Sequence, residues 1–141
     1  MTTELLALGA PGGSLRVVIS PIGAGRPLAA DEEPSFDAVY EIDANPFGGT
    51  LRDALLASDL TAWRDAIAEL RPPADITLGG GRAAELHLHV EAGRDDHWTV
   101  EVQLRRSGDD PWPEIRYLVF GVEPFADRAV KAATTALGGH S

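Results

Sequence analysis

The second half of the sequence alternates apolar and polar residues in successive segments, and this pattern most narrows the folds that the chain can adopt. A period of two residues is typical of a β-strand with one face buried and the other in water. The segments span residues 74–78, 83–91, 97–105 and 114–122, and their connections are short and rich in Gly, Asp or Pro. Strands joined by such turns pair with their sequence neighbours, so the pattern predicts an antiparallel meander.

The first half contains weaker strand signals. The apolar runs at residues 3–8 and 14–20 flank the turn sequence APGG and predict a hairpin. In the segment SFDAVYEIDAN, apolar and acidic residues alternate, which predicts another strand with an acidic outer face. Residues 21–34 are rich in Gly, Pro and acids and have no period, so we expect a flexible surface loop. The segment TLRDALLASD is compatible with either a short helix or a strand.

Two helices are predicted, at about residues 59–70 and 124–137. The first has one apolar stripe at helical spacing, formed by Leu60, Trp63, Ile67 and Leu70, and two prolines follow its end. The second begins with a proline and stops before a glycine, as helices commonly do. Together the elements predict a single α+β domain over residues 1–141, with both helices packed on one antiparallel sheet of about five to seven strands.

The charge of the chain limits the partners that we expect. The sequence has 22 acidic and 12 basic residues, which gives a formal net charge of -10. Such a balance repels nucleic acid and anionic membranes and favours a basic protein partner, although solubility alone also explains acidic surfaces. There is no cysteine, no basic segment before the first apolar run, and no apolar stretch of membrane-spanning length. We therefore expect a cytoplasmic protein that binds neither nucleic acid nor membrane.

Two histidines, His87 and His89, lie on the polar face of the strand ELHLHVEA. A hairpin that pairs Val90 with Trp98 would place His87 opposite Glu101 and His89 opposite Thr99. Two imidazoles and the Glu101 carboxylate are ligands that zinc or iron accepts, so a metal site is one interpretation. We favour an ordinary polar sheet face. Because no catalytic or phosphate-binding motif is present either, we expect no catalytic residue and no cofactor.

The strand at residues 114–122 is apolar on both faces. A strict period of two places Leu118, Phe120 and Val122 on one face, opposite to Ile115 and Tyr117. A strand of this kind needs cover on both sides. We expect the C-terminal helix to supply the second cover, and a homodimer through this strand is the alternative.

The three tryptophans have different expected roles. Trp63 and Trp98 lie on apolar faces and are predicted to be in the core, since large aromatic side chains dominate core burial. Trp112 stands between two prolines behind two acidic residues, so we expect it to be exposed. Exposed tryptophan is enriched among the residues that dominate protein interfaces.

Several segments occur in a distinctive order: YEIDANPFGG, DLTAWRDAIAEL, ADITLGGGRAAELHLHV, HWTVEVQL, IRYLVFGVEPF and a closing helix. In this order the chain resembles the WapI-type immunity proteins and related uncharacterised actinobacterial families over most of its length. The resemblance implies a bacterial protein that binds and neutralises a cognate toxin, often a nuclease, and that is not an enzyme. It assigns no role to any residue by position.

We therefore expect a non-catalytic protein-binding domain, with an immunity role against a basic, nuclease-like toxin as its specific form. A metal-binding domain or metal-dependent enzyme that uses His87 and His89 is one alternative, and a structural or homo-oligomeric domain is another. The predicted partner-binding residues are Asp31, Glu32, Glu33, Asp37, Glu41, Asp43, Asp95, Asp96, Asp109, Asp110 and Trp112.

Overall fold

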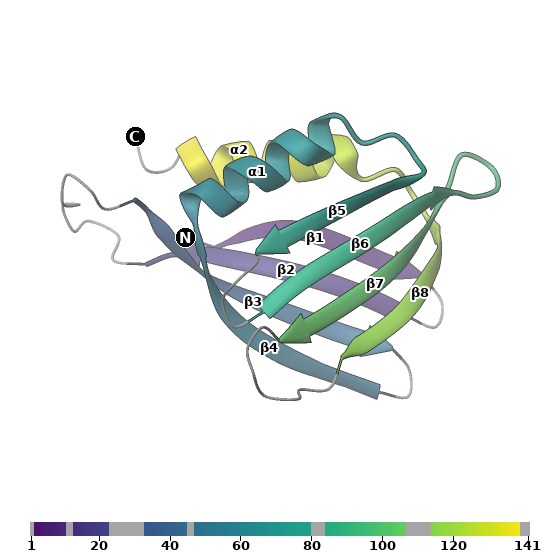
Figure 1. Cartoon of the computed structure of the whole chain (residues 1–141), viewed down its shortest axis with the longest axis horizontal. Coiled ribbons are helices and arrows are strands. Elements are labelled where there is room, and N and C mark those ends of the chain that lie inside the picture. The colour runs from purple at the N-terminus through teal and green to yellow at the C-terminus, as the bar shows by residue number, and fades with distance from the viewer. Residues whose placement is uncertain are drawn as a thin grey trace.

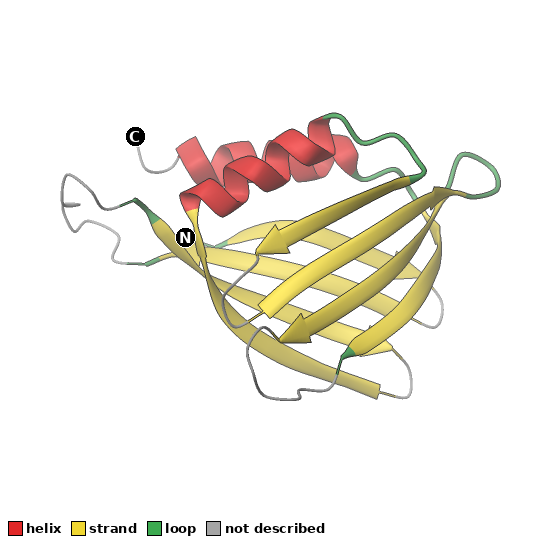
Figure 2. Cartoon of the chain, in the orientation of Figure 1, coloured by secondary structure: helices red, strands yellow, loops and turns green. Residues whose placement is uncertain are grey.

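The computed structural model of the chain describes residues 2–10, 13–22, 33–44, 47–79, 84–106 and 114–138. Within these residues the chain forms eight strands and two helices, in the order of four strands, a helix, four strands and a helix (Figures 1 and 2). The predicted α+β class, the antiparallel pairing and the two helices are confirmed. In the described part of the chain, no helix is long and apolar enough to cross a bilayer.

The described strands form two antiparallel sheets of four strands each, both with neighbours in sequence order. Sheet A contains β1 (Thr3–Ala10), β2 (Gly13–Pro21), β3 (Ser35–Ala44) and β4 (Phe47–Leu56). Helix α1 (Ala57–Ala68) leads to sheet B, which contains β5 (Ala74–Gly79), β6 (Ala84–Ala92), β7 (Trp98–Arg106) and β8 (Ile115–Val122). Helix α2 (Ala126–Gly138) follows β8.

The structure differs from the predicted single sheet of five to seven strands. The segment TLRDALLASD, which the sequence left open between helix and strand, forms a strand up to Leu56, and together with residues 47–49 it pairs with β3. Gly48, Gly49 and Asp53 weaken the strand signal of this segment, and tertiary pairing overrides it. Because α1 separates the two meanders, β5 starts a second sheet. The predicted meander in the C-terminal half is confirmed as sheet B.

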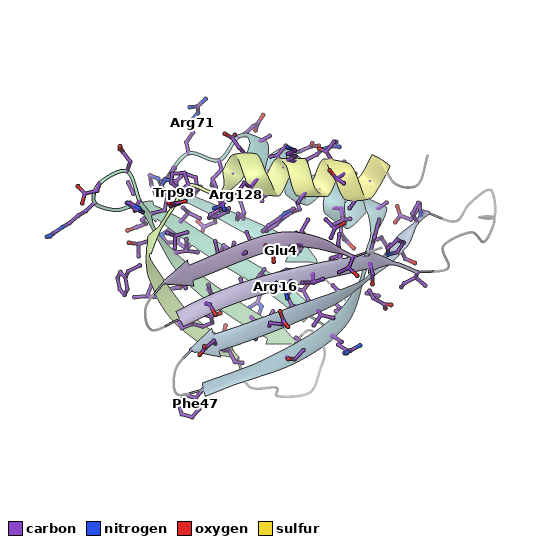
Figure 3. All side chains as sticks on the ribbon, turned by 180° about the vertical axis from the view of Figure 1, so that it is seen from behind. Glu4, Arg16, Phe47, Arg71, Trp98 and Arg128 are labelled. Atoms are coloured by element: carbon purple, nitrogen blue, oxygen red, sulfur yellow. The ribbon has the colours of Figure 1, made fainter. Side chains whose placement is uncertain are left out.

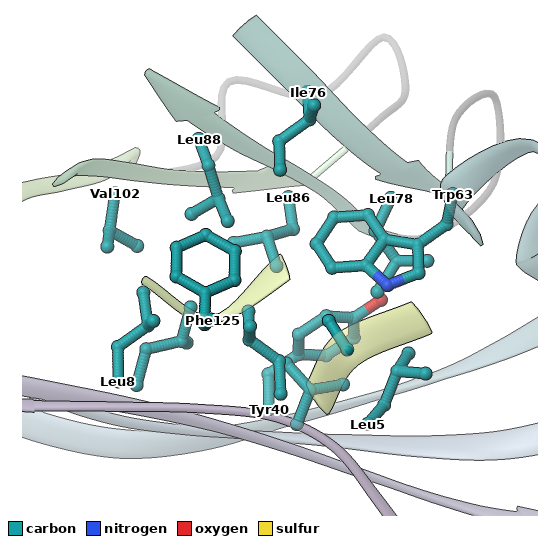
Figure 4. Close-up of a cluster of buried hydrophobic side chains, with 14 of the residues drawn as sticks. Leu5, Leu8, Tyr40, Trp63, Ile76, Leu78, Leu86, Leu88, Val102 and Phe125 are labelled. Carbon is teal, nitrogen blue, oxygen red and sulfur yellow. The ribbon is translucent and has the colours of Figure 1, made fainter. Parts of the chain in front are cut away.

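The two sheets face each other, and their inner side chains meet in one core. Figure 4 shows Trp63 and Phe125 between residues of sheet A, such as Tyr40, and residues of sheet B, such as Leu88. Helix α2 contacts β1, helix α1 contacts β5, and the helices contact each other. The helices therefore close the sandwich along one side, and the first residues of β4 and β8 lie on the opposite side (Figure 1).

Local contacts fix the ends of α1. The helix begins two residues before its predicted start, and the carboxylate of Asp59 accepts a hydrogen bond from the Leu56 N–H at 2.8 Å. An acid in the first turn also suits the positive end of the helix dipole. Trp63 is fully buried, as predicted, whereas Trp98 is only partly buried and packs its ring edge-on against Phe125 at a centroid distance of 5.2 Å.

Strand β8 departs from the predicted two-face pattern. A register shift lies between the pairs Trp98–Val122 and Val100–Val119, and Gly121 adopts a positive φ of 64° there, which a glycine accepts without strain. The irregularity turns Val122 into the core, so the prediction that Val122 shares a face with Leu118 and Phe120 was wrong. Leu118 and Phe120 remain 47% and 61% exposed, since α2 packs on β1 and α1 rather than over them.

Candidate functional site

The histidine pair lies on the outer face of sheet B, in a register that differs from the prediction. His89 pairs with Glu101, and His87 pairs with Gln103, a shift of two residues that keeps both side chains on the predicted face. Both imidazoles also approach Asp75 of β5, at 2.8 Å from His89 Nδ1 and 3.4 Å from His87 Nε2. Asp75 was not among the predicted site residues, although its alternation with Ile76 and Leu78 places it on this face.

His89 lies between two carboxylates. Its Nε2 atom is 3.0 Å from Glu91 Oε1 and its Nδ1 atom is 2.8 Å from Asp75 Oδ1, and both nitrogens donate only when the ring is protonated. These hydrogen bonds, first to Glu91 and then to Asp75, raise the pKa of His89. Among the described residues, no group of three or more His, Asp or Glu side chains is arranged to hold a metal ion. The geometry is that of a charge-paired polar face.

The raised pKa of His89 predicts a pH-dependent contribution to stability. The contribution is fully present below the unfolded-state pKa of about 6.5 and is lost as the pH rises through the folded-state value. We expect His89→Gln to lower the melting temperature more at about pH 5 than at about pH 8. In a background with Asp75→Asn and Glu91→Gln, the difference between the two pH values should shrink. An equal loss at both pH values would contradict this account.

The structure brings together only part of the predicted acidic site. Asp37, Glu41 and Asp43 form one exposed row on the outer face of β3. Glu33 precedes β3 and accepts a hydrogen bond from Ser58 Oγ at 2.9 Å, so it ties the start of β3 to α1. Asp95 and Asp96 are exposed in the β6–β7 turn of the other sheet, both with positive φ. The remaining predicted residues lie outside the described residues: Asp31, Glu32, Asp109, Asp110 and Trp112.

Arg16 on β2 borders this acidic row. Its Nε atom donates to Glu4 at 2.6 Å and its Nη1 atom donates to Glu41 at 2.9 Å, and these two hydrogen bonds raise the pKa of Arg16. Figure 3 shows Arg16 and Glu4 side by side on the outer face of sheet A. Glu41 is therefore engaged within the sheet. The row begins at Asp37 and ends at Asp43.

A groove of about 330 Å³ lies where sheets A and B part, on the side away from the helices. Ile42 and Phe47 line it from sheet A, and Ile115 and Tyr117 line it from β8. Phe47 is 77% exposed and projects from the end of β4 (Figure 3). Phe47 was not among the predicted site residues, because NPFGG has the composition of a turn and no period marks the Phe47 side chain.

Comparisons with known proteins identify a family and a fold. The profile described as "Family of unknown function (DUF5959)" matches residues 3–108, which include β1 to β7. No curated protein sequence matches the chain. Among solved structures, that of the plant transcriptional regulator PBF-2 is similar, with a TM-score of 0.50 and 13% sequence identity over 97% of this chain and 81% of the other. At this identity the similarity concerns the fold alone.

Proposed function

The chain belongs to the DUF5959 family, a family of unknown function, and we propose that it is a non-catalytic protein-binding domain for a basic partner. The observation that carries the proposal is the exposed row of Asp37, Glu41 and Asp43 on the outer face of sheet A, in a chain of net charge -10. Complementary charge accelerates association with a basic surface and rejects acidic competitors.

An immunity role against a basic, nuclease-like toxin is the specific form of this proposal. A nuclease needs a basic surface to bind the phosphates of nucleic acid. A row of carboxylates held on a β-sheet also carries negative charge and can bind to the same surface. In this role the protein acts by binding and performs no chemistry. The partner is then a bacterial toxin whose gene lies next to the gene of this chain.

The structural neighbour suggests a different role, because PBF-2 is a plant transcriptional regulator. Proteins that bind nucleic acid present basic surfaces to the phosphates. This chain has 22 acidic against 12 basic residues, which opposes such binding. We therefore transfer the fold and not the role.

The proposal is tested with the purified products of the reading frames adjacent to this gene. We expect one basic product to bind in isothermal titration calorimetry, more weakly at high than at low ionic strength. The triple variant Asp37→Asn, Glu41→Gln, Asp43→Asn should weaken binding by about tenfold or more. If the partner is a toxin, the chain should also suppress its activity.

The matched control neutralises acids on a distant surface, with Asp65→Asn and Glu69→Gln at exposed positions of α1 and its C-terminal end. This variant should bind like the unmodified chain. Binding that ignores both ionic strength and the β3 variant, or binding only to acidic products, would argue against the proposed function.

A further inference from the structure

Strand β4 is an open edge of sheet A. It is the last strand in the order β1-β2-β3-β4, and residues 47–50 and 52 are exposed. In an antiparallel edge strand, every second residue directs its N–H and C=O groups away from the sheet, where another strand can bind them. Gly48 and Gly49 leave this part of the backbone without side chains. A Cβ atom at Gly49 would meet no atom of the described residues within 4 Å.

On the outer face, small side chains separate this edge from the carboxylates of β3. Asp43 pairs with Gly48, Glu41 with Thr50, and Asp37 with Ala54. Adjacent strands lie about 5 Å apart, so a strand added to β4 would run about 10 Å from β3. Lysine or arginine side chains on the added strand would extend over Gly48 to the carboxylate of Asp43 and over Ala54 to that of Asp37. Arg52 is the one basic residue of the β4 outer row, and it stands opposite Val39.

On the inner face, the same edge borders the apolar groove. Gly49 and Leu51 pair with the buried residues Ile42 and Tyr40, so their side of β4 faces the core. Phe47 and Ile115 stand at the groove with exposed fractions of 77% and 40%. An apolar side chain on an added strand would point into this groove and would cover both residues.

From these three features we propose that the β4 edge binds an extended segment of a basic protein, which adds to sheet A as a fifth strand. The segment alternates Lys or Arg with apolar residues: the basic side chains face Asp37 and Asp43, and an apolar side chain fills the groove at Phe47 and Ile115. Main-chain hydrogen bonds supply affinity and the alternating side chains supply specificity, as in other cases of strand addition. The inference rests on the proposed function and names the surface and the partner's chemistry.

A second copy of this chain fits the edge less well. Pairing of two β4 strands would join two molecules of formal charge -10 and would place both rows of β3 carboxylates on one continuous surface. A basic strand meets no such repulsion, because its positive charges neutralise the carboxylates of β3. The charges therefore favour a partner of different sequence.

The test uses three synthetic peptides and the whole chain. The probe is Lys-Val-Lys-Phe-Lys-Val-Lys with blocked termini, and the charge control is Glu-Val-Glu-Phe-Glu-Val-Glu. In amide proton–nitrogen correlation spectra of isotope-labelled protein, we expect the basic probe to shift the resonances of Gly48, Gly49 and Thr50, and the acidic peptide to leave them unchanged. A third peptide repeats the basic probe with methylated backbone nitrogens on alternate residues, which removes hydrogen bonds and keeps the charge.

Two protein variants complete the design. Asp37→Lys with Asp43→Lys should weaken binding of the basic probe by about tenfold or more. The matched reversal Asp65→Lys with Glu69→Lys, on α1 and at its C-terminal end, should leave binding within about twofold. The methylated peptide should also bind at least about tenfold more weakly than the probe.

Other outcomes overturn the inference in distinguishable ways. Equal binding of the methylated peptide, or shifts away from β4, would show that an acidic surface attracts the probe without strand addition, and the proposed function would survive. Shifts of the β4 resonances on concentrating the protein alone would show that a second copy occupies the edge. Failure of the basic probe to bind would remove the β4 site, while the experiment with adjacent gene products would still decide the proposed function.

Discussion

Replacing Phe125 with alanine should lower the free energy of unfolding by about 3–5 kcal/mol. Phe125 is only 2% exposed, lies just before α2 and packs edge-on against Trp98 of β7. The truncation removes buried apolar surface and leaves a cavity where the closing helix joins the core. Since domains of this size are stable by about 5–15 kcal/mol, the loss is a large part of the total. Denaturant unfolding followed by circular dichroism measures it.

Two phenylalanines of the same chain provide the control. Phe47 and Phe120 are 77% and 61% exposed, so Phe47→Ala and Phe120→Ala should change the free energy of unfolding by no more than about 0.5 kcal/mol. If Phe120→Ala were as destabilising as Phe125→Ala, the assignment of inner and outer faces of β8 would be wrong.

Trp63→Ala should have an effect of similar size, about 3–5 kcal/mol. Trp63 projects from α1 into the space between the sheets and is fully buried (Figure 4). Its truncation would leave a cavity where α1, the helix that joins the two meanders, packs on the core. Chemical denaturation should show a lower midpoint with an unchanged slope, which indicates lost stability without a change in the surface exposed on unfolding.

Tyr40→Phe changes the same region of the core, but it should not lower the free energy of unfolding. The hydroxyl of Tyr40 and the Nε1 atom of Trp63 are buried, and neither has a hydrogen-bond partner among the described residues. Burial is the main cause of the raised pKa of Tyr40, and the charges of Asp53 and Asp59 add to it. Removing a buried, unpaired hydroxyl should leave stability unchanged or raise it by about 1 kcal/mol. A loss comparable to that of Trp63→Ala would mean that the hydroxyl has a partner.

The sequence predicted most elements because their residues repeat with a clear period. The meander at 74–122 and the Trp63 helix follow directly from alternation and from helical spacing. The division into two sheets did not follow, because pairing between strands depends on contacts distant in sequence. The alternation of buried apolar and exposed polar residues along a strand is the same whether the strands form one sheet or two. Residues 47–49 of β4 were not predicted as strand, because Gly48 and Gly49 hide the period, and the rest of β4 was left open between helix and strand.

The candidate site was predicted less well than the fold. The row Asp37, Glu41 and Asp43 follows from the period of β3. By contrast, the approach of Asp75 to the histidines and the groove at Phe47 depend on which strands are neighbours. The predicted pairing of the histidine strand β6 with β7 was wrong by two residues. Both pairings place the apolar residues of the two strands on the same face, so the apolar pattern alone does not distinguish them.

The arrangement of two successive units of four strands and a helix has a consequence for synthesis on the ribosome. Every strand pair joins sequence neighbours within one unit, so sheet A and α1 can form their hydrogen bonds before the rest of the chain emerges. The inner face of sheet A, which includes Leu15, Val17 and Phe36, then remains exposed to solvent until sheet B has been synthesised and has folded over it. The nascent half-sandwich is therefore the state of this protein that most needs protection from aggregation.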